Sequence, residues 1–171
     1  MSNLVFVAMG SNIDPLGNMP AAAEMLADAL EVSSVSSVYE TDPVGRIDQP
    51  RFLNAALLAR TTLTPEELKL GLLRPIEARL GRVRTSDRNA PRTIDLDIAL
   101  FGDLVVDDPA SGIQIPDPDI ERRAHLALPL ADLAPGFVHP ANGCTLASLA
   151  RPFADSPGVR LLTMPLLPMA A

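Results

Sequence analysis

The sequence predicts an α+β protein of the ferredoxin-like βαββαβ sandwich class, with an antiparallel sheet and helices packed on one face of that sheet. Over the first hundred residues, segments typical of strands and helices follow one another as strand, helix, strand, strand, helix and strand. The chain has 171 residues, of which 47% are hydrophobic, so it has the length of one domain and enough apolar residues for a core.

The first half of this pattern begins with an apolar run over residues 4–9 that ends at Gly10-Ser11-Asn12, typical of a buried strand and a turn. An Ala-rich segment over residues 20–30 has a helical period. Residues 32–39 are rich in strand formers. Two prolines and a glycine favour an irregular loop over residues 41–50, and a long strand is predicted over residues 52–62.

The second helix begins at Thr64-Pro65-Glu66-Glu67, where Thr64 is placed as the N-cap and Glu67 completes a capping box. Pro75 removes a backbone hydrogen bond, so we expect a kink near Gly71, and Gly81 ends the helix. Its predicted buried face consists of apolar residues that recur every four positions, at Leu68, Leu72, Ile76 and Leu80.

The rest of the chain adds smaller elements to this core. A strand over residues 93–101 is followed by Gly102-Asp103, which predicts a hairpin turn into residues 104–106. Short helices are predicted over residues 121–132 and 146–153. Pro165 and Pro168 interrupt the apolar tail, so we expect residues 155–171 to be an extended part of the single domain formed by residues 1–171.

Composition excludes several classes of function. With 14 Lys and Arg against 21 Asp and Glu, the net charge is −7, which disfavours nucleic acid as a partner. No apolar stretch has the length of a membrane span, and no basic segment precedes the first apolar run, so we expect a cytoplasmic protein without membrane contact. As a separate expectation, we take the protein to be a monomer. The single Cys144 excludes an internal disulfide, and two isolated histidines do not form a metal cluster by spacing.

Two acidic residues carry the strongest chemical signal. Asp95 and Asp97 are two positions apart on a predicted strand, so their side chains project from one face and offer oxygen ligands to a divalent cation. Arg82, Arg84 and Arg92 lie close by in sequence, and such a set suits phosphoryl or pyrophosphoryl transfer. The Gly-Lys-Ser/Thr ending of a P-loop is absent from the sequence, and ordinary surface ion pairs are the alternative interpretation.

A second pair of residues indicates a flat ligand. Phe52 and Asn54 are two positions apart on the strand that follows the irregular loop, so they share a face. The ring offers a stacking surface and the amide offers a donor beside an acceptor, which together suit a planar heterocycle. The alternative is that Phe52 is an ordinary core aromatic.

Several stretches of the chain together form a recognisable pattern, of which the most specific is Pro91-Arg92-Thr93-Ile94-Asp95-Leu96-Asp97-Ile98. The other stretches of the pattern, in chain order, are Ala8-Met9-Gly10-Ser11-Asn12, Tyr39-Glu40-Thr41, Asp48-Gln49-Pro50-Arg51-Phe52-Leu53-Asn54-Ala55, Gly81-Arg82-Val83-Arg84, Ile115-Pro116, Leu128-Pro129-Leu130 and Ala134-Pro135. With these motifs the chain resembles the 6-hydroxymethyl-7,8-dihydropterin pyrophosphokinase family, in which ATP donates a pyrophosphoryl group to a pterin alcohol in folate biosynthesis and AMP is released.

The resemblance implies an ATP-dependent transferase that binds ATP with two Mg²⁺ ions. It implies that Asp95 and Asp97 hold the metal ions and that Arg82 and Arg92 assist the transfer. The residues implied on the nucleotide side are Glu77, Arg84, Ile98 and Arg123. The residues implied in the pterin pocket are Thr41, Asp42, Val44, Phe52, Asn54 and His125, where His125 replaces the usual Phe.

The chain also departs from the family pattern. Asn89 stands where a Trp is typical, and Asp117-Pro118 stands where His-Pro or His-Tyr is typical. Because the usual His helps bind ATP phosphates, an anionic Asp117 would repel them unless it faced a metal ion or an arginine. Arg74 in place of a Gln on the second helix offers partial compensation. Two alternatives therefore accompany the main reading: a paralogue that acts on a related pterin, and a noncatalytic pterin- or nucleotide-binding protein.

Overall fold

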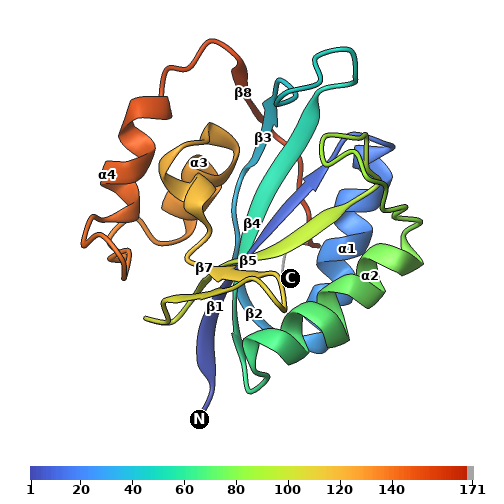
Figure 1. Cartoon of the computed structure of the whole chain (residues 1–171). Coiled ribbons are helices and arrows are strands. Elements are labelled where there is room, and N and C mark those ends of the chain that lie inside the picture. The colour runs from blue at the N-terminus through green and yellow to red at the C-terminus, as the bar shows by residue number, and fades with distance from the viewer. Residues whose placement is uncertain (169–171) are drawn as a thin grey trace.

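An antiparallel sheet forms the middle of the molecule, with helices on both sides of it (Figure 1). The computed structural model describes residues 1–168, and within this range the sheet has six strands in the order β5-β1-β4-β3-β8, with β2 also paired to β4. Its strands are β1 (Asn3–Ser11), β2 (Glu31–Val35), β3 (Val38–Thr41), β4 (Phe52–Thr61), β5 (Asp95–Phe101) and β8 (Val159–Leu162). The predicted mixed fold with an antiparallel sheet is confirmed.

The register of the central strands places the chemically interesting residues next to one another. Gly10 near the end of β1 is paired with Asn54 on one side and with Asp95 on the other. Ala8, two residues earlier in β1, is paired with Asp97. Polar groups from β4 and β5 therefore meet across the end of β1, which carries only small residues at these positions.

One face of the sheet is covered by two helices that follow β1 and β4 in sequence. The first begins at Pro15, five residues before the predicted start, and buries Met19, Ala22, Ala23 and Leu26 against the sheet. These helices are α1 (Pro15–Ala29), a π-helical segment (Glu67–Leu73) and α2 (Arg74–Arg79), which continues it.

The start of the second helix is stabilised as predicted. The Thr64 N–H donates to Glu67 Oε2 at 2.8 Å, and the Glu67 N–H donates to Thr64 Oγ1 at 3.2 Å, which completes the capping box. Pro75 does not produce a simple kink. Instead, the turns before it widen into the π-helix, a form that usually appears as a local adjustment within an α-helix.

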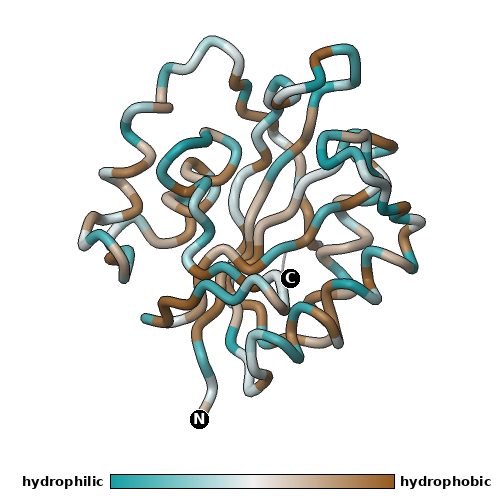
Figure 2. Tube along the Cα trace, viewed as in Figure 1, coloured by the Kyte–Doolittle hydropathy of each residue, from teal (hydrophilic) through white to brown (hydrophobic). Residues whose placement is uncertain are grey.

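The prediction that helices pack on only one face is wrong, because α3 (Ala124–Leu133) and α4 (Leu146–Ala150) cover the opposite face (Figure 1). Several strand side chains that point to this side are apolar, among them Phe6, Ala56 and Leu100, and they form a second core with Leu130 of α3. Figure 2 shows mostly hydrophobic residues along the central strands and mainly hydrophilic ones in the connecting segments. A sheet that is apolar on both faces requires cover on both.

The chain after β5 differs from the predicted hairpin. Gly102 has a φ of +51° and makes a turn, but β5 pairs with β1, whereas β6 (Val106–Asp108) pairs with β7 (Ile113–Ile115) in a separate small sheet. A short 3-10 helix (Pro118–Glu121) then leads to α3, and another (Arg151–Phe153) follows α4. Among residues 1–168, no helix is long and apolar enough to cross a membrane.

Part of the tail has a defined place in the sheet. Residues Val159–Leu162 form β8, which pairs with β3 from Val38 to Thr41 and makes the edge of the sheet. The end of the predicted extended tail, residues 169–171, lies outside the described residues.

Candidate active site

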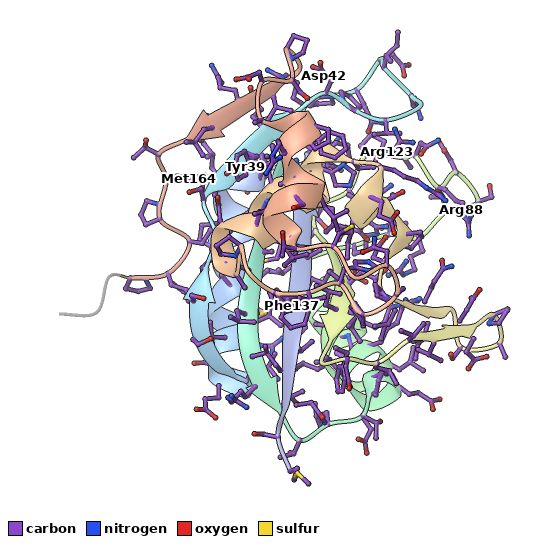
Figure 3. The ribbon with its side chains drawn as sticks, turned by 90° about the vertical axis from the view of Figure 1, so that its left-hand side faces the viewer. Tyr39, Asp42, Arg88, Arg123, Phe137 and Met164 are labelled. Atoms are coloured by element: carbon purple, nitrogen blue, oxygen red, sulfur yellow. The ribbon has the colours of Figure 1, made fainter. Side chains whose placement is uncertain are left out.

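A pocket of about 450 Å³ opens at the end of the sheet where β1 stops and the loops at residues 42–51 and 82–94 meet α3. In Figure 3 the labelled side chains of Asp42, Arg88 and Arg123 lie in the upper half of the view, at this end of the molecule. Ten of the fourteen predicted site residues line the pocket: Thr41, Asp42, Val44, Phe52, Asn54, Arg92, Asp95, Asp97, Arg123 and His125.

The two aspartates of β5 form the acidic wall of this pocket. Alternation along the strand buries Leu96 and Ile98 in the core and leaves the Asp95 and Asp97 side chains 42% and 47% exposed. This arrangement follows from the sequence pattern, and it places two carboxylates next to each other on one strand face.

Each of these carboxylates is paired with a cation. Arg92 Nη1 lies 3.1 Å from Asp95 Oδ2, and Arg82 Nη2 lies 3.5 Å from Asp95 Oδ1. Asp97 is paired with Lys69, whose Nζ lies 3.2 Å from Asp97 Oδ1. Arg82 is buried behind Asp95 and does not line the pocket, and burial lowers the pKa of its guanidinium.

The other three predicted site residues that do not line the pocket are Glu77, Arg84 and Ile98. Glu77 is fully buried, and its Oε1 accepts the Leu96 N–H at 2.8 Å while Oε2 pairs with Arg84. Burial raises the pKa of the Glu77 carboxyl, against the lowering effect of these hydrogen bonds and of Arg84. Glu77 therefore supports β5 from the α2 side, next to the two aspartates.

The opposite wall has the properties of a ring-binding surface. Asn54 is buried near the start of β4, and its amide donates to Thr41 Oγ1 at 2.9 Å and to the Tyr39 carbonyl at 3.1 Å. The guanidinium carbon of Arg92 lies 5.7 Å from the centre of the Phe52 ring, within cation–π range. Arg92 therefore contacts both the acidic wall and the aromatic wall.

The two loops beside the pocket are joined through one buried residue, Asn12. Its Nδ2 donates to Gln49 Oε1 at 2.8 Å and to the Pro50 carbonyl at 3.0 Å. Its Oδ1 accepts the Arg92 N–H at 2.8 Å, and Gln49 Nε2 donates to the Asn89 carbonyl at 2.7 Å. The position of Arg92 thus depends on the end of β1 as well as on its own loop.

Two residues that depart from the family pattern also line the pocket. Asp117 caps the short 3-10 helix by accepting the Asp119 N–H at 2.8 Å. Burial, together with the nearby Asp97 and Asp119, raises the pKa of Asp117 to about 6, against this hydrogen bond and Lys69, which lower it. Burial also lowers the pKa of His125, which favours the neutral imidazole.

Sequence reasoning missed three residues of this site. Lys69 is the one lysine in the sequence, but the excess of arginine over lysine suggests a compositional bias without function, so Lys69 gives no signal of its contact with Asp97. Asn12 was read as part of a turn, and its buried position is a tertiary feature without a local signal. Arg88 lines the pocket from the second loop, where only its basic character gave a signal.

Fold and pocket together define an α+β protein that presents a cluster of acids and arginines beside a ring-binding surface. The chain matches the model of the 7,8-dihydro-6-hydroxymethylpterin-pyrophosphokinase family over residues 6–135, and it belongs to this family. The resemblance inferred from the sequence motifs is confirmed.

Individual relatives agree with this assignment. A 2-amino-4-hydroxy-6-hydroxymethyldihydropteridine pyrophosphokinase of Pseudomonas aeruginosa is 42% identical over 138 residues, which cover 79% of this chain and 83% of that protein. The Bacillus subtilis protein of the same name is also 42% identical, over 78% of this chain and 79% of its own length.

Other relatives are much longer than this chain. A folic acid synthesis protein of Pneumocystis carinii is 36% identical over 88% of this chain, which spans only 20% of that protein. The crystal structure of Plasmodium falciparum HPPK-DHPS wild type with pteroate superposes with a TM-score of 0.69 at 16% identity. It covers 90% of this chain and 42% of the Plasmodium chain, and at this identity it supports the fold alone.

Proposed function

We propose that the protein transfers pyrophosphate from ATP to 6-hydroxymethyl-7,8-dihydropterin and forms AMP and the pterin diphosphate, a step of folate biosynthesis. One observation carries this proposal: a single pocket joins the ring-binding wall of Phe52 and Asn54 to the acidic wall of Asp95 and Asp97. The names of relatives that align over about four-fifths of their own length support the same activity.

The pterin would occupy the ring-binding end of the pocket. Its ring would stack between Phe52 and His125, and Asn54 would hydrogen-bond its polar edge. The neutral form of His125 suits this role, because an uncharged imidazole presents a flat face without a competing charge. The residues proposed to line the rest of the pterin site are Thr41, Asp42 and Val44.

The acidic wall fits Mg²⁺ bound together with a polyphosphate. Among residues 1–168 there is no group of three or more His, Cys, Asp or Glu side chains placed to hold a metal ion. Asp95 and Asp97 would therefore be the protein ligands of a bound Mg²⁺, which would receive one or two carboxylates from them. Mg²⁺ commonly takes its remaining ligands from water and substrate phosphates. When bound, Mg²⁺ supplies neutralisation of the triphosphate charge. We propose two such ions with ATP.

The arginines would neutralise charge on the group that is transferred. Arg92 lines the pocket and Arg82 lies directly behind Asp95, so both are placed to act beside the acidic wall. Arg123 would contact the nucleotide from the mouth of the pocket. Glu77, Arg84 and the backbone of Ile98 would act on the nucleotide side, where Glu77 accepts the Leu96 N–H of β5 and pairs with Arg84.

In the reaction, the hydroxymethyl oxygen of the pterin attacks the β-phosphorus of ATP in line with the bond to the α-phosphate oxygen. A new oxygen–phosphorus bond forms, the bond between the β-phosphorus and the α–β bridging oxygen breaks, and AMP leaves with that oxygen. The hydroxyl proton passes to solvent. No covalent enzyme intermediate is required, so the protein acts by positioning and by charge stabilisation.

The test is AMP formation from ATP and Mg²⁺ with 6-hydroxymethyl-7,8-dihydropterin, with a control that lacks the pterin. We expect pterin-dependent AMP, and we expect Asp97→Ala to abolish it without unfolding the protein, because Asp97 projects from the core. Asp103→Ala, which changes an exposed aspartate in the turn after β5, is the matched control and should keep full activity. A folded protein that binds pterin without forming AMP would contradict the proposal.

We also propose that the first hundred residues have the ferredoxin-like arrangement and that the whole chain acts as one cytoplasmic domain without a partner subunit. The sheet order β5-β1-β4-β3 and the packing of α1 and α2 in one core on one face of the sheet support the arrangement. Size-exclusion chromatography with light scattering tests the monomer, for which we expect 18.2 kDa. A mass twice as large would refute it.

A further inference from the structure

Lys69 is placed to act on the acidic wall from outside the pocket. It lies on the π-helix Glu67–Leu73, on the face of the sheet that α1 and α2 cover, and it does not line the pocket. Its Nζ nevertheless lies 3.2 Å from Asp97 Oδ1 and donates to the Gly112 carbonyl at 2.8 Å. The Lys69 side chain therefore starts on the helical layer on one face of the sheet and ends at the Asp97 carboxylate, which lines the pocket on the other face.

This contact is unlike an ordinary surface ion pair. The Lys69 side chain is only 12% exposed, whereas Asp97 is 47% exposed toward the pocket. An exposed lysine loses much rotamer freedom when it pairs, and such pairs contribute little. Here the ammonium is held by a backbone carbonyl of the β6–β7 turn as well as by the carboxylate, so it stays in place.

The contacts on Asp97 fall on a single oxygen. Oδ1 accepts Lys69 and also the Ile98 N–H at 2.9 Å. A carboxylate fixed through one oxygen keeps its rotation angle and presents the other oxygen, Oδ2, in a defined direction. Groups that hydrogen-bond to a metal-binding carboxylate orient it, and their loss commonly reduces metal affinity or activity about 10- to 100-fold.

We propose that Lys69 is a positioning residue, which fixes Asp97 through Oδ1 so that Oδ2 is oriented to receive the divalent cation. The inference rests on the proposed metal-binding role of Asp97. This role gives a function to the one lysine of the sequence and a reason for the burial of its ammonium group. Lys69 contacts neither substrate and acts only through Asp97.

The test measures metal affinity directly. Mn²⁺ is titrated into the protein with a non-hydrolysable ATP analogue present, and free Mn²⁺ is followed by electron paramagnetic resonance. We expect Lys69→Met to weaken Mn²⁺ binding about 10- to 100-fold. The matched control is Arg79→Met, which removes an exposed cation from α2 and should leave the affinity unchanged. Unchanged or tighter binding by Lys69→Met would overturn the proposal.

A second comparison separates positioning from a general structural effect. In an Asp97→Asn background, Lys69→Met should cause no further loss of Mn²⁺ affinity, because the carboxylate that it orients is gone. An equal loss in both backgrounds would contradict the proposal, as would a wild-type affinity that does not depend on Asp97. If Lys69→Met does not fold, Lys69→Gln, which keeps a polar end, is judged by the same criteria.

Failure of this inference is distinguishable from failure of the proposed function. A wild-type protein that makes AMP, combined with an unaltered Mn²⁺ affinity in Lys69→Met, refutes the role of Lys69 alone. A wild-type protein that binds Mn²⁺ through Asp97 but makes no AMP refutes the proposed reaction. The Mn²⁺ affinity of Lys69→Met then still decides whether Lys69 positions Asp97.

Discussion

Asp117 offers a quantitative test of the electrostatics of the pocket, through the substitution Asp117→Asn. Its pKa is raised to about 6, first because the carboxyl is buried and then because Asp97 and Asp119 lie close to it. The interval from the ordinary pKa of 3.8 to about 6 corresponds to about 3 kcal/mol of disfavoured ionisation in the folded state. Asn is as good an N-cap as Asp, so the substitution keeps the hydrogen bond from the Asp119 N–H.

The sign of the effect follows from proton binding. Between pH 3.8 and about 6 the folded state holds a proton on Asp117 that the unfolded state has lost, so the free energy of unfolding falls as the pH rises. Above this window the full penalty is present, and Asp117→Asn removes it. About 2 of the 3 kcal/mol develop between pH 4.5 and pH 8, so the variant should gain that much relative to the natural protein.

The assay is urea unfolding of both proteins at pH 4.5 and pH 8, without nucleotide or metal. The matched control is Asp103→Asn, an exposed aspartate whose substitution should show no such dependence on pH. The reasoning is refuted if the difference in stability between Asp117→Asn and the natural protein is the same at both pH values. It is also refuted if the variant is the less stable protein at pH 8.

Two further predictions concern residues that support the site from outside the pocket. Asn12→Ala removes three side-chain hydrogen bonds and leaves the Arg92 N–H without its acceptor, so we expect a loss of about 2–4 kcal/mol in urea unfolding. Asn12→Ala should also speed proteolysis within residues 82–94, and an unchanged cleavage rate there would show that Asn12 does not hold this loop. Thr64→Ala breaks the capping box and should cost about 1 kcal/mol in thermal unfolding, with AMP formation unchanged. A loss near zero would mean that the π-helix does not depend on its cap.

Local patterns were sufficient for much of the fold. Strands at both ends of the βαββαβ pattern lie within a few residues of their predicted bounds, and the capping box forms at Thr64 and Glu67 as its spacing indicated. The period of two along β5 correctly placed Asp95 and Asp97 away from the core. These features depend on neighbours in sequence, which is why sequence alone predicts them.

The errors arose where distant segments compete for the same partner. Gly102 predicted a hairpin, but β1 supplies the partner of β5, so the chain after the turn pairs elsewhere. Helices cover both faces of the sheet because β1 and β4 also carry apolar side chains on the face that packs against α3. In the sequence, such apolar strands look the same as strands that are buried on one face only. Asn12 and Lys69 act through residues at least 28 positions away, and no local pattern reports such contacts.

Charge around β5 explains how the family site persists with an aspartate at position 117. Asp95 is paired with Arg82 and Arg92, and Asp97 with Lys69, so each carboxylate of the acidic wall has its own cation. Asp117 takes part in none of the ion pairs within residues 1–168, and its negative charge is limited by its raised pKa. Lys69 opposes this shift by lowering that pKa, so the ammonium that pairs with Asp97 also favours the ionised form of Asp117. Burial and the neighbouring carboxylates outweigh Lys69, so Asp117, which would repel phosphate when ionised, keeps its proton to a higher pH than an ordinary aspartate.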